Sequence, residues 1–293
     1  MSGDLFARGR DFIYREGRLL ERRLFAAVYE GAPREAVVDC VRGYRNPDGG
    51  FGHALEPDKR APDSQPLDVE IALGALDDAN AFDTELVRGA CDFLETVADE
   101  RGALPVLLPA IAAYPRANHW QADEYPPGPL PAMGIAALLY KNGVEHSWLE
   151  PVTSYCWSVV EDDPPDDAHA LRECFAFVEH VPDRSRAESA AEKLAATLPR
   201  ARWFNPEPGA EDYGLTPLQF APSPDSPWRA LFDEAQIDGH LDRLEGEQEE
   251  DGGWPLAWEP PSMASRLEWR GIETLRVLRV LVAYGRAGPG SGA

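Results

Sequence analysis

The chain has 293 residues, of which 44% are hydrophobic and 10% aromatic, a composition that excludes a disordered protein. Its 28 basic and 51 acidic residues give a formal net charge of −23 at pH 7, so its long-range field repels polyanions. We therefore expect neither nucleic acid nor an anionic membrane surface as a general partner.

Cysteine usage and the start of the chain bear on the cellular compartment. The four cysteines are Cys40, Cys91, Cys156 and Cys174. They are widely spaced without a CxxC pair, which favours reduced thiols over disulfides or a zinc cluster. Charged residues interrupt the first fifteen positions, and no apolar run is long enough to span a bilayer. The sequence predicts a cytoplasmic protein with no signal peptide and no integral membrane segment.

Apolar residues spaced three and four apart predict several helices in the first half of the chain. The short start with Phe6 and Phe12 is assigned no helix. Helices are expected over residues 18–29, over residues 33–44, from Pro66 onwards, and after Asp83, which is a good N-cap. Residues 103–129 are rich in Pro and aromatic residues, which indicates a structured loop.

The second half continues with helical hairpins. Helices are expected over residues 130–140, after a cap at Ser147, over 167–180 and over 184–198. A second loop over residues 199–227 follows, then a helix around Leu241 and a last helix that carries Leu278. No convincing alternating strand pattern occurs, so the fold is expected to be all-α.

A ten-residue pattern, DGG-aromatic-x-x-A-[LW]-E-P, occurs at residues 48–57 and again at residues 251–260. The two copies lie 203 positions apart, and Glu70 maps onto Glu273 at the same offset. This indicates a distant internal repeat, with four units of about 51 residues. Near-identical first and last turns favour a closed ring over an open solenoid, which needs distinct caps. We predict an α/α toroid of helical hairpins in a single domain, residues 1–286, with a flexible tail, residues 287–293.

The repeated turn resembles the repeat of the terpenoid cyclase and protein prenyltransferase superfamily, whose members are α/α toroids. Residues 247–254 are close to the Gln-to-Trp repeat of squalene-hopene cyclases, with Gln248 and Trp254 in the matching places. The chain is also similar to uncharacterised bacterial prenyltransferase-like proteins. The DxDD motif of class II cyclases is absent, and no Cys beyond Cys174 supplies the prenyltransferase zinc triad. We therefore carry over no catalytic residue, and we expect neither a metal nor a cofactor.

Carboxylates that follow the turns are the candidate catalytic residues. Glu56 and Glu259 occupy the same place after each turn, where they either cap backbone N–H groups or form an acid/base pair. Asp58, Asp63 and Asp68 form an acidic group after the first turn. A buried member could act as a proton donor, and a hydrated group could bind a divalent metal. The structural alternative is that the charges are solvated, with Asp68 stabilised by the dipole of its helix.

Aromatic and polar side chains near the two turns and in the first long loop are candidate substrate-binding residues. They are His53, His119, Trp120, Trp254, Trp258, Glu268, Trp269 and Arg270. The face of a Trp ring can stabilise a cation. The structural alternative is that Trp254 fills the space between neighbouring helices, and that His119 is incidental.

The leading hypothesis is a terpenoid-cyclase-like enzyme that acts on an isoprenoid or other largely apolar substrate in a central cavity. Its chemistry would be acid-initiated and would pass through a carbocation. One alternative is a carbohydrate-active toroid, in which Glu56 and Glu259 would lie about 5 to 10 Å apart. Another is a non-catalytic toroid that binds a lipid or a protein partner. The substrate and the oligomeric state are left open.

Overall fold

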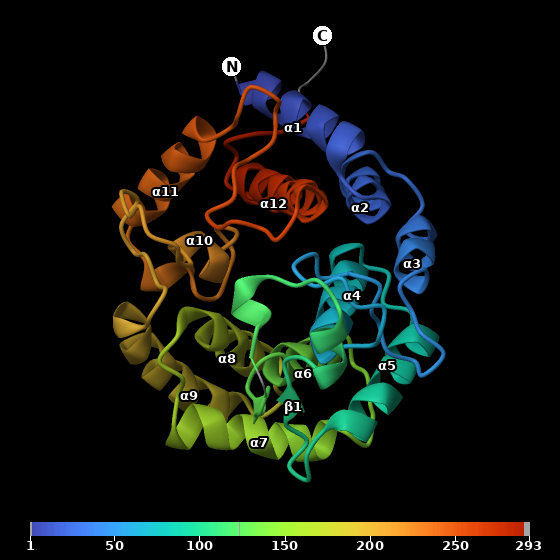
Figure 1. Cartoon of the computed structure of the whole chain (residues 1–293). Helices are drawn as coiled ribbons and strands as arrows, with labels where there is room; N and C mark the ends of the chain where they lie inside the picture. Colours follow the sequence, from blue (N-terminus) through green and yellow to red (C-terminus); the bar gives the residue numbers. More distant parts are fainter. Residues whose placement is uncertain (1, 123, 290–293) are drawn as a thin grey trace. The chain divides into compact units, whose positions relative to one another are not determined.

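The computed structural model describes residues 2–122 and 124–289, most of which are helical (Figure 1). This confirms the predicted all-α fold class. The helices group into two compact units, Pro33–Ala201 and Met1–Ala32 with Arg202–Ala293. The single domain over residues 1–286 stays a prediction, and residues 290–293 of the predicted tail lie outside the described residues. None of the described helices has the length and apolar character needed to cross a bilayer.

The first unit, Pro33–Ala201, is built around a row of three helices. These are α4 (Pro66–Asp78), α6 (Ala132–Lys141) and α8 (Ala168–His180), with α6 in the middle (Figure 1). The other helices, which pack against this row, are α3 (Glu35–Arg42), α5 (Thr84–Val97), α7 (Leu149–Asp162) and α9 (Arg184–Thr197). Alternate helices along the chain therefore lie in two layers, which is the packing expected of helical hairpins.

Of the two expected caps, one is right and one is wrong. Asp83 accepts a hydrogen bond from the first turn of α5, and Asp167, which was not predicted as a cap, does the same for α8. Ser147 does not cap α7, because Trp148 is the residue at the N-cap position. Trp148 is buried, and its indole N–H donates to the carbonyl of Gly102. Side-chain packing fixes this helix start, and a capping pattern cannot reveal that.

The loop predicted over residues 103–129 is present in its described residues, 103–122 and 124–129. It contains two short antiparallel strands, β1 (Leu104–Pro105) and β2 (Pro127–Gly128). Two 3₁₀ helices, η1 (Pro109–Ala113) and η2 (Asn118–Trp120), lie between them. A third, η3 (Leu198–Arg200), follows α9.

The second unit contains a helix that the sequence did not predict, α1 (Ser2–Glu16). It packs against α2 (Leu19–Tyr29) and α12 (Met263–Ala283), with Phe12 and Ile13 fully buried. Dense charge masks its apolar face in the sequence, and contact with α12 supplies the missing stabilisation. The other elements are α10 (Pro217–Phe220), η4 (Arg229–Leu231) and α11 (Glu234–Gly246).

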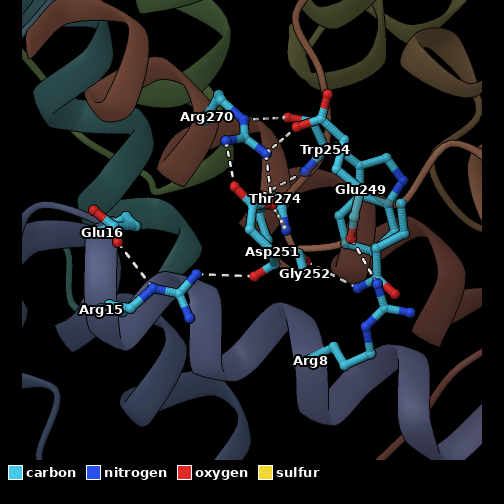
Figure 2. Close-up of polar contacts among 11 residues, drawn as sticks. Arg8, Arg15, Glu16, Glu249, Asp251, Gly252, Trp254, Arg270 and Thr274 are labelled. Carbon is cyan, nitrogen blue, oxygen red and sulfur yellow. Dashed lines mark hydrogen bonds and ion pairs between the residues drawn. The ribbon is translucent and has the colours of Figure 1, made fainter. Parts of the chain in front are cut away.

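The two DGG turns have the same local geometry. Gly49 and Gly252 have φ values of +91° and +92°, and the carboxylates of Asp48 and Asp251 each accept from the N–H two residues on at 3.0 Å. A Cβ added to Gly49 would lie 2.3 Å from the carbonyl oxygen of Gly89, and one on Gly252 would lie 2.4 Å from that of Arg8. Figure 2 shows Arg8 and Arg15 of α1 bound to the second turn. Glycine is therefore required at both positions, because the backbone has a positive φ and a side chain would clash with a neighbouring carbonyl oxygen.

We predict that Gly49→Ala lowers the free energy of unfolding by about 2–4 kcal/mol, because a methyl group there meets a backbone oxygen at positive φ. The matched control is Gly74→Ala in α4, where an added Cβ meets nothing within 4 Å. That substitution should stabilise the protein by about 0.5–1 kcal/mol, as Ala does in helices. Urea unfolding of both variants measures the difference, and similar values for the two would contradict the prediction.

Candidate functional site

The loop after the first turn buries a lysine among three carboxyl groups. The side chain of Lys59 is fully buried, with Nζ 2.5 Å from Asp68 Oδ1 and 3.9 Å from Glu56 Oε2. Asp68 Oδ1 also accepts from the backbone N–H of Glu56 at 2.7 Å. Asp58 is buried as well, at 2% exposure. We call Glu56, Asp58, Lys59 and Asp68 the Lys59 cluster.

Two structural elements bring this cluster together. The turn delivers Glu56, and Pro66 begins α4 so that Asp68 lies in its first turn. The N–H of Gln65, the residue just before α4, donates to the carbonyl of Phe51 at 2.8 Å, which ties the end of the loop back to the turn. Burying an ion pair costs desolvation energy, which close contacts and additional hydrogen bonds must offset. The Lys59 cluster therefore holds the loop in place by ion pairing, in addition to the hydrogen bond between Gln65 and Phe51.

The carboxyl group of Glu56 has a pKa close to neutral pH. Burial raises its pKa to about 7. Lys59 and a hydrogen bond from the backbone of Asp58 oppose the rise, whereas the charges of Asp58 and Asp68 add to it. Its Oε2 atom is buried and accepts no hydrogen bond from the described residues. Glu56 is thus poised to gain or lose a proton near neutral pH, whereas Asp68 is bound directly to the Lys59 ammonium group.

Four other predicted residues lie at or beyond the edge of the cluster. His119 Nε2 lies 3.6 Å from Asp58 Oδ2, and burial lowers the pKa of this imidazole. Trp120 packs beside His119, with ring centroids 4.8 Å apart. Asp63 is exposed, and the exposed His53 contacts Asn46 Oδ1 at 3.0 Å. The structure therefore brings together Glu56, Asp58 and Asp68, with His119 beside them.

The residues predicted after the second turn belong to the other unit and are arranged differently. The Glu259 side chain is 77% exposed and pairs with Arg266. Trp254 is buried, and its indole N–H donates to the carbonyl of Leu244 at 2.7 Å. The rings of Trp258 and Trp269 pack edge to face with centroids 5.2 Å apart, and Glu268 is partly exposed on α12.

Arg270 is bound to the second turn itself (Figure 2). Its guanidinium donates to Asp251 Oδ2 at 2.7 Å, to Glu249 Oε2 at 2.5 Å and to the Trp254 carbonyl at 3.1 Å. It also lies 4.6 Å from the centre of the Phe12 ring. Most of its hydrogen-bonding capacity is therefore used to hold the turn.

Sequence reasoning missed a second acidic group in the first unit, formed by Glu70 of α4 and Glu173 of α8. A Cβ added to Gly134 of α6 would lie 2.1 Å from Glu70 Oε1 and 1.9 Å from Glu173 Oε2. The two oxygens are therefore at most about 4 Å apart, and the two side chains share a hydrogen bond. Arg172 binds the other oxygen of Glu173 at 2.7 Å. We call Glu70 and Glu173 the carboxyl pair.

The carboxyl pair holds a proton. Burial and the neighbouring Glu173 both raise the pKa of Glu70 well above its usual value, and Arg172 only partly offsets them. Two carboxylates at this distance cannot both be ionised without strong repulsion. Glu70 is therefore the member of the pair for which the protonated form is favoured.

Glu70 lies on the more open face of α4. The opposite face, with Val69, Leu73 and Leu76, is fully buried, whereas Leu67, Glu70 and Ile71 are only partly buried. Glu70 is thus partly buried, and its carboxyl group lies beside Gly134 of α6 and Glu173 of α8. The only sequence signal was the match of Glu70 to Glu273; Glu173 lies 103 residues further on, and nothing in the pattern connects the two.

Metal binding has no support from the described ranges, 2–122 and 124–289, where no group of three or more His, Cys, Asp and Glu side chains is placed to hold an ion. The carboxyl groups of Glu56 and Glu70, whose pKa values are raised, are candidates for proton transfer.

Comparison with known proteins shows the fold. No family model and no curated protein matches the sequence. A protein of known structure from Actinoplanes is similar at 16% identity and a TM-score of 0.57, covering 97% of this chain and 99% of that one. A type II terpene cyclase from Scytonema, solved with its substrate geranylgeranyl dihydroxybenzoate, is similar at 11% identity and a TM-score of 0.52, covering 96% and 97%. The chain therefore has a terpenoid-cyclase-like fold.

We predict that Lys59→Met lowers the free energy of unfolding by about 3–5 kcal/mol, since it leaves buried carboxylates without their counter-charge. Lys141→Met is the control, because Lys141 is 46% exposed and pairs with Asp77. The control should change stability by no more than about 1 kcal/mol. Chemical denaturation at pH 7.5 compares the variants; a loss as small in Lys59→Met as in the control would show that the cluster contributes little.

Proposed function

We propose that the protein is a terpenoid-cyclase-like enzyme that acts on an isoprenoid or other largely apolar substrate by acid-initiated chemistry. The observation that carries the proposal is the contact between Glu70 and Glu173, whose carboxyl oxygens lie at most about 4 Å apart, with burial and Glu173 raising the pKa of Glu70. The fold supports it, because a similar structure is a type II terpene cyclase bound to a geranylgeranyl compound. We assign Glu70 as the proton donor.

The proposed reaction needs an acid, a cation and a base. Glu70 donates its proton to a carbon–carbon double bond, whose electron pair forms the new C–H bond and leaves a carbocation on the neighbouring carbon. A second double bond attacks this cation and closes a ring. Loss of a proton from the final cation restores neutrality, so the product is an isomer of the substrate. Arg172, which is bound to Glu173, partly offsets the repulsion between the two carboxylates after Glu70 has given up its proton.

The acidic residues of the first loop supply a second candidate donor. Glu56 qualifies because burial raises its pKa to about 7. Asp68 is bound to Lys59, and Asp63 is exposed, so neither is favoured as a donor over Glu56. Asp58 and His119 would serve as partners of such an acid. The carbohydrate alternative gains no support from Glu259, which is exposed and paired with Arg266.

We predict that the purified protein, incubated in D₂O with geranylgeranyl dihydroxybenzoate and other polyprenyl compounds, forms a cyclised isomer that carries one deuterium. Mass spectrometry detects the added mass. Glu70→Gln should reduce product formation by about 100-fold or more, because the introduced amide can donate a hydrogen bond to Glu173 but cannot deliver a proton. Glu188→Gln, at an exposed position of α9, is the control and should retain activity.

Activity should fall as pH rises through the raised pKa of Glu70, since the donor is active only while protonated. Loss of product in Glu56→Gln with full activity in Glu70→Gln would move the donor to the Lys59 cluster. Cyclised product without deuterium would rule out proton initiation from an exchangeable acid.

A further inference from the structure

A segment of the first long loop lies over the Lys59 cluster and the start of α4. We call residues 104–120 the strap. Its carbonyl at Val106 accepts from the N–H of Leu67, and its N–H at Leu108 donates to Gln65 Oε1 at 2.6 Å. Leu107 and Ile111 of the strap pack with Ala61 in a small buried apolar cluster. The strap therefore covers the turn of α4 that carries Asp68.

Asp58 connects the strap to the cluster by both its backbone and its side chain. The carbonyl of Asp58 accepts from the N–H of Ala117 at 2.7 Å, and its carboxylate faces His119 at 3.6 Å. Two residues on, the N–H of Arg60 donates to the carbonyl of Pro115 at 2.9 Å. A displacement of Asp58 would thus break the bonds that close the strap.

We propose that Glu56 is a pH-sensitive latch, whose buried carboxyl group holds the strap closed while protonated and releases it when ionised. Ionisation would place a new negative charge next to Asp58 and Asp68, on a buried oxygen that accepts no hydrogen bond from the described residues. Lys59 cannot neutralise this charge fully, because its Nζ is 3.9 Å from Glu56 Oε2 and 2.5 Å from Asp68 Oδ1. Movement of the Asp58 carboxylate away from Glu56 relieves the repulsion, although the hydrogen bond from the Asp58 backbone to Glu56 opposes this movement.

The direction of the pH effect follows from the two states of Glu56. Its pKa is raised from 4.5 to about 7 in the closed state, whereas a solvated carboxyl group in the open state keeps the usual value. The closed state therefore binds more protons between these values, and it loses stability as pH rises through them. The ratio of open to closed strap should rise about tenfold per pH unit over this range and level off above it.

The other charged groups around Glu56 determine which variants are needed to test the latch. Lys59 and Asp58 lie in its own loop, Asp68 on α4, and His119 and Arg116 on the strap, with Arg116 bound to strap carbonyls. His119 acts in the opposite direction, since burial lowers its pKa and the open state is protonated first as pH falls. Its side chain is 51% exposed, so it can be replaced without leaving a buried cavity.

Hydrogen exchange of the Arg60 and Ala117 amides between pH 5 and 8, corrected for the intrinsic rate, measures opening of the strap. In His119→Gln, which leaves Glu56 as the titrating group, protection of these amides should fall roughly 100-fold over this range, relative to amides inside α5. Glu56→Gln should abolish the fall. Glu259→Gln, at the equivalent place after the second turn, should leave it unchanged.

Constant protection in His119→Gln, or an undiminished fall in Glu56→Gln, would overturn the latch. If Glu56→Gln does not fold, the pH dependence of amide protection in His119→Gln still tests the latch. Because the readout is amide exchange in the absence of substrate, the outcome is independent of the proposed cyclisation. Product formation can fail while the latch is present, and the reverse also holds.

Discussion

The contact between Lys59 and Asp68 is the interaction on which the first unit most depends. A fully buried ammonium group is tolerated only beside a carboxylate, and Asp68 lies 2.5 Å away in the first turn of α4. The same carboxylate accepts the backbone N–H of Glu56, so one oxygen ties the helix, the loop and the lysine together. The contact therefore joins the loop that carries Glu56 to the first turn of α4.

The second turn shows what happens when the same local geometry meets a different environment. Asp251 and Gly252 repeat the conformation of Asp48 and Gly49, yet the charge that holds the second turn comes from Arg270 on α12. No lysine is buried beyond it in the part of the chain that the structure describes, and Glu259 is exposed. A shared turn therefore delivers an enclosed carboxyl group in one copy and a solvated one in the other.

The carboxyl pair depends on the absence of a side chain at Gly134. The oxygens of Glu70 and Glu173 fill the space that a Cβ there would occupy, which lets helices α4 and α8 bring two acids together across α6. Such closeness forces the pair to keep a proton, and Arg172 directs where it resides. The acid–base properties of this site thus depend on the packing of three helices, each of which contributes one essential residue.

The sequence by itself determined the all-α class, most helix positions and the two DGG turns, because helical periodicity, capping residues and glycine conformation are local properties. It also placed Glu56, Asp58 and Asp68 in one short stretch. Tertiary structure alone decided that Lys59 is buried among them, that Glu259 is solvated, and that Glu70 meets Glu173 from a distant helix. Burial and proton sharing depend on which elements pack together, and one sequence without an alignment carries no signal for such contacts. The unpredicted helix α1 has the same cause, since its apolar face is stabilised by α12.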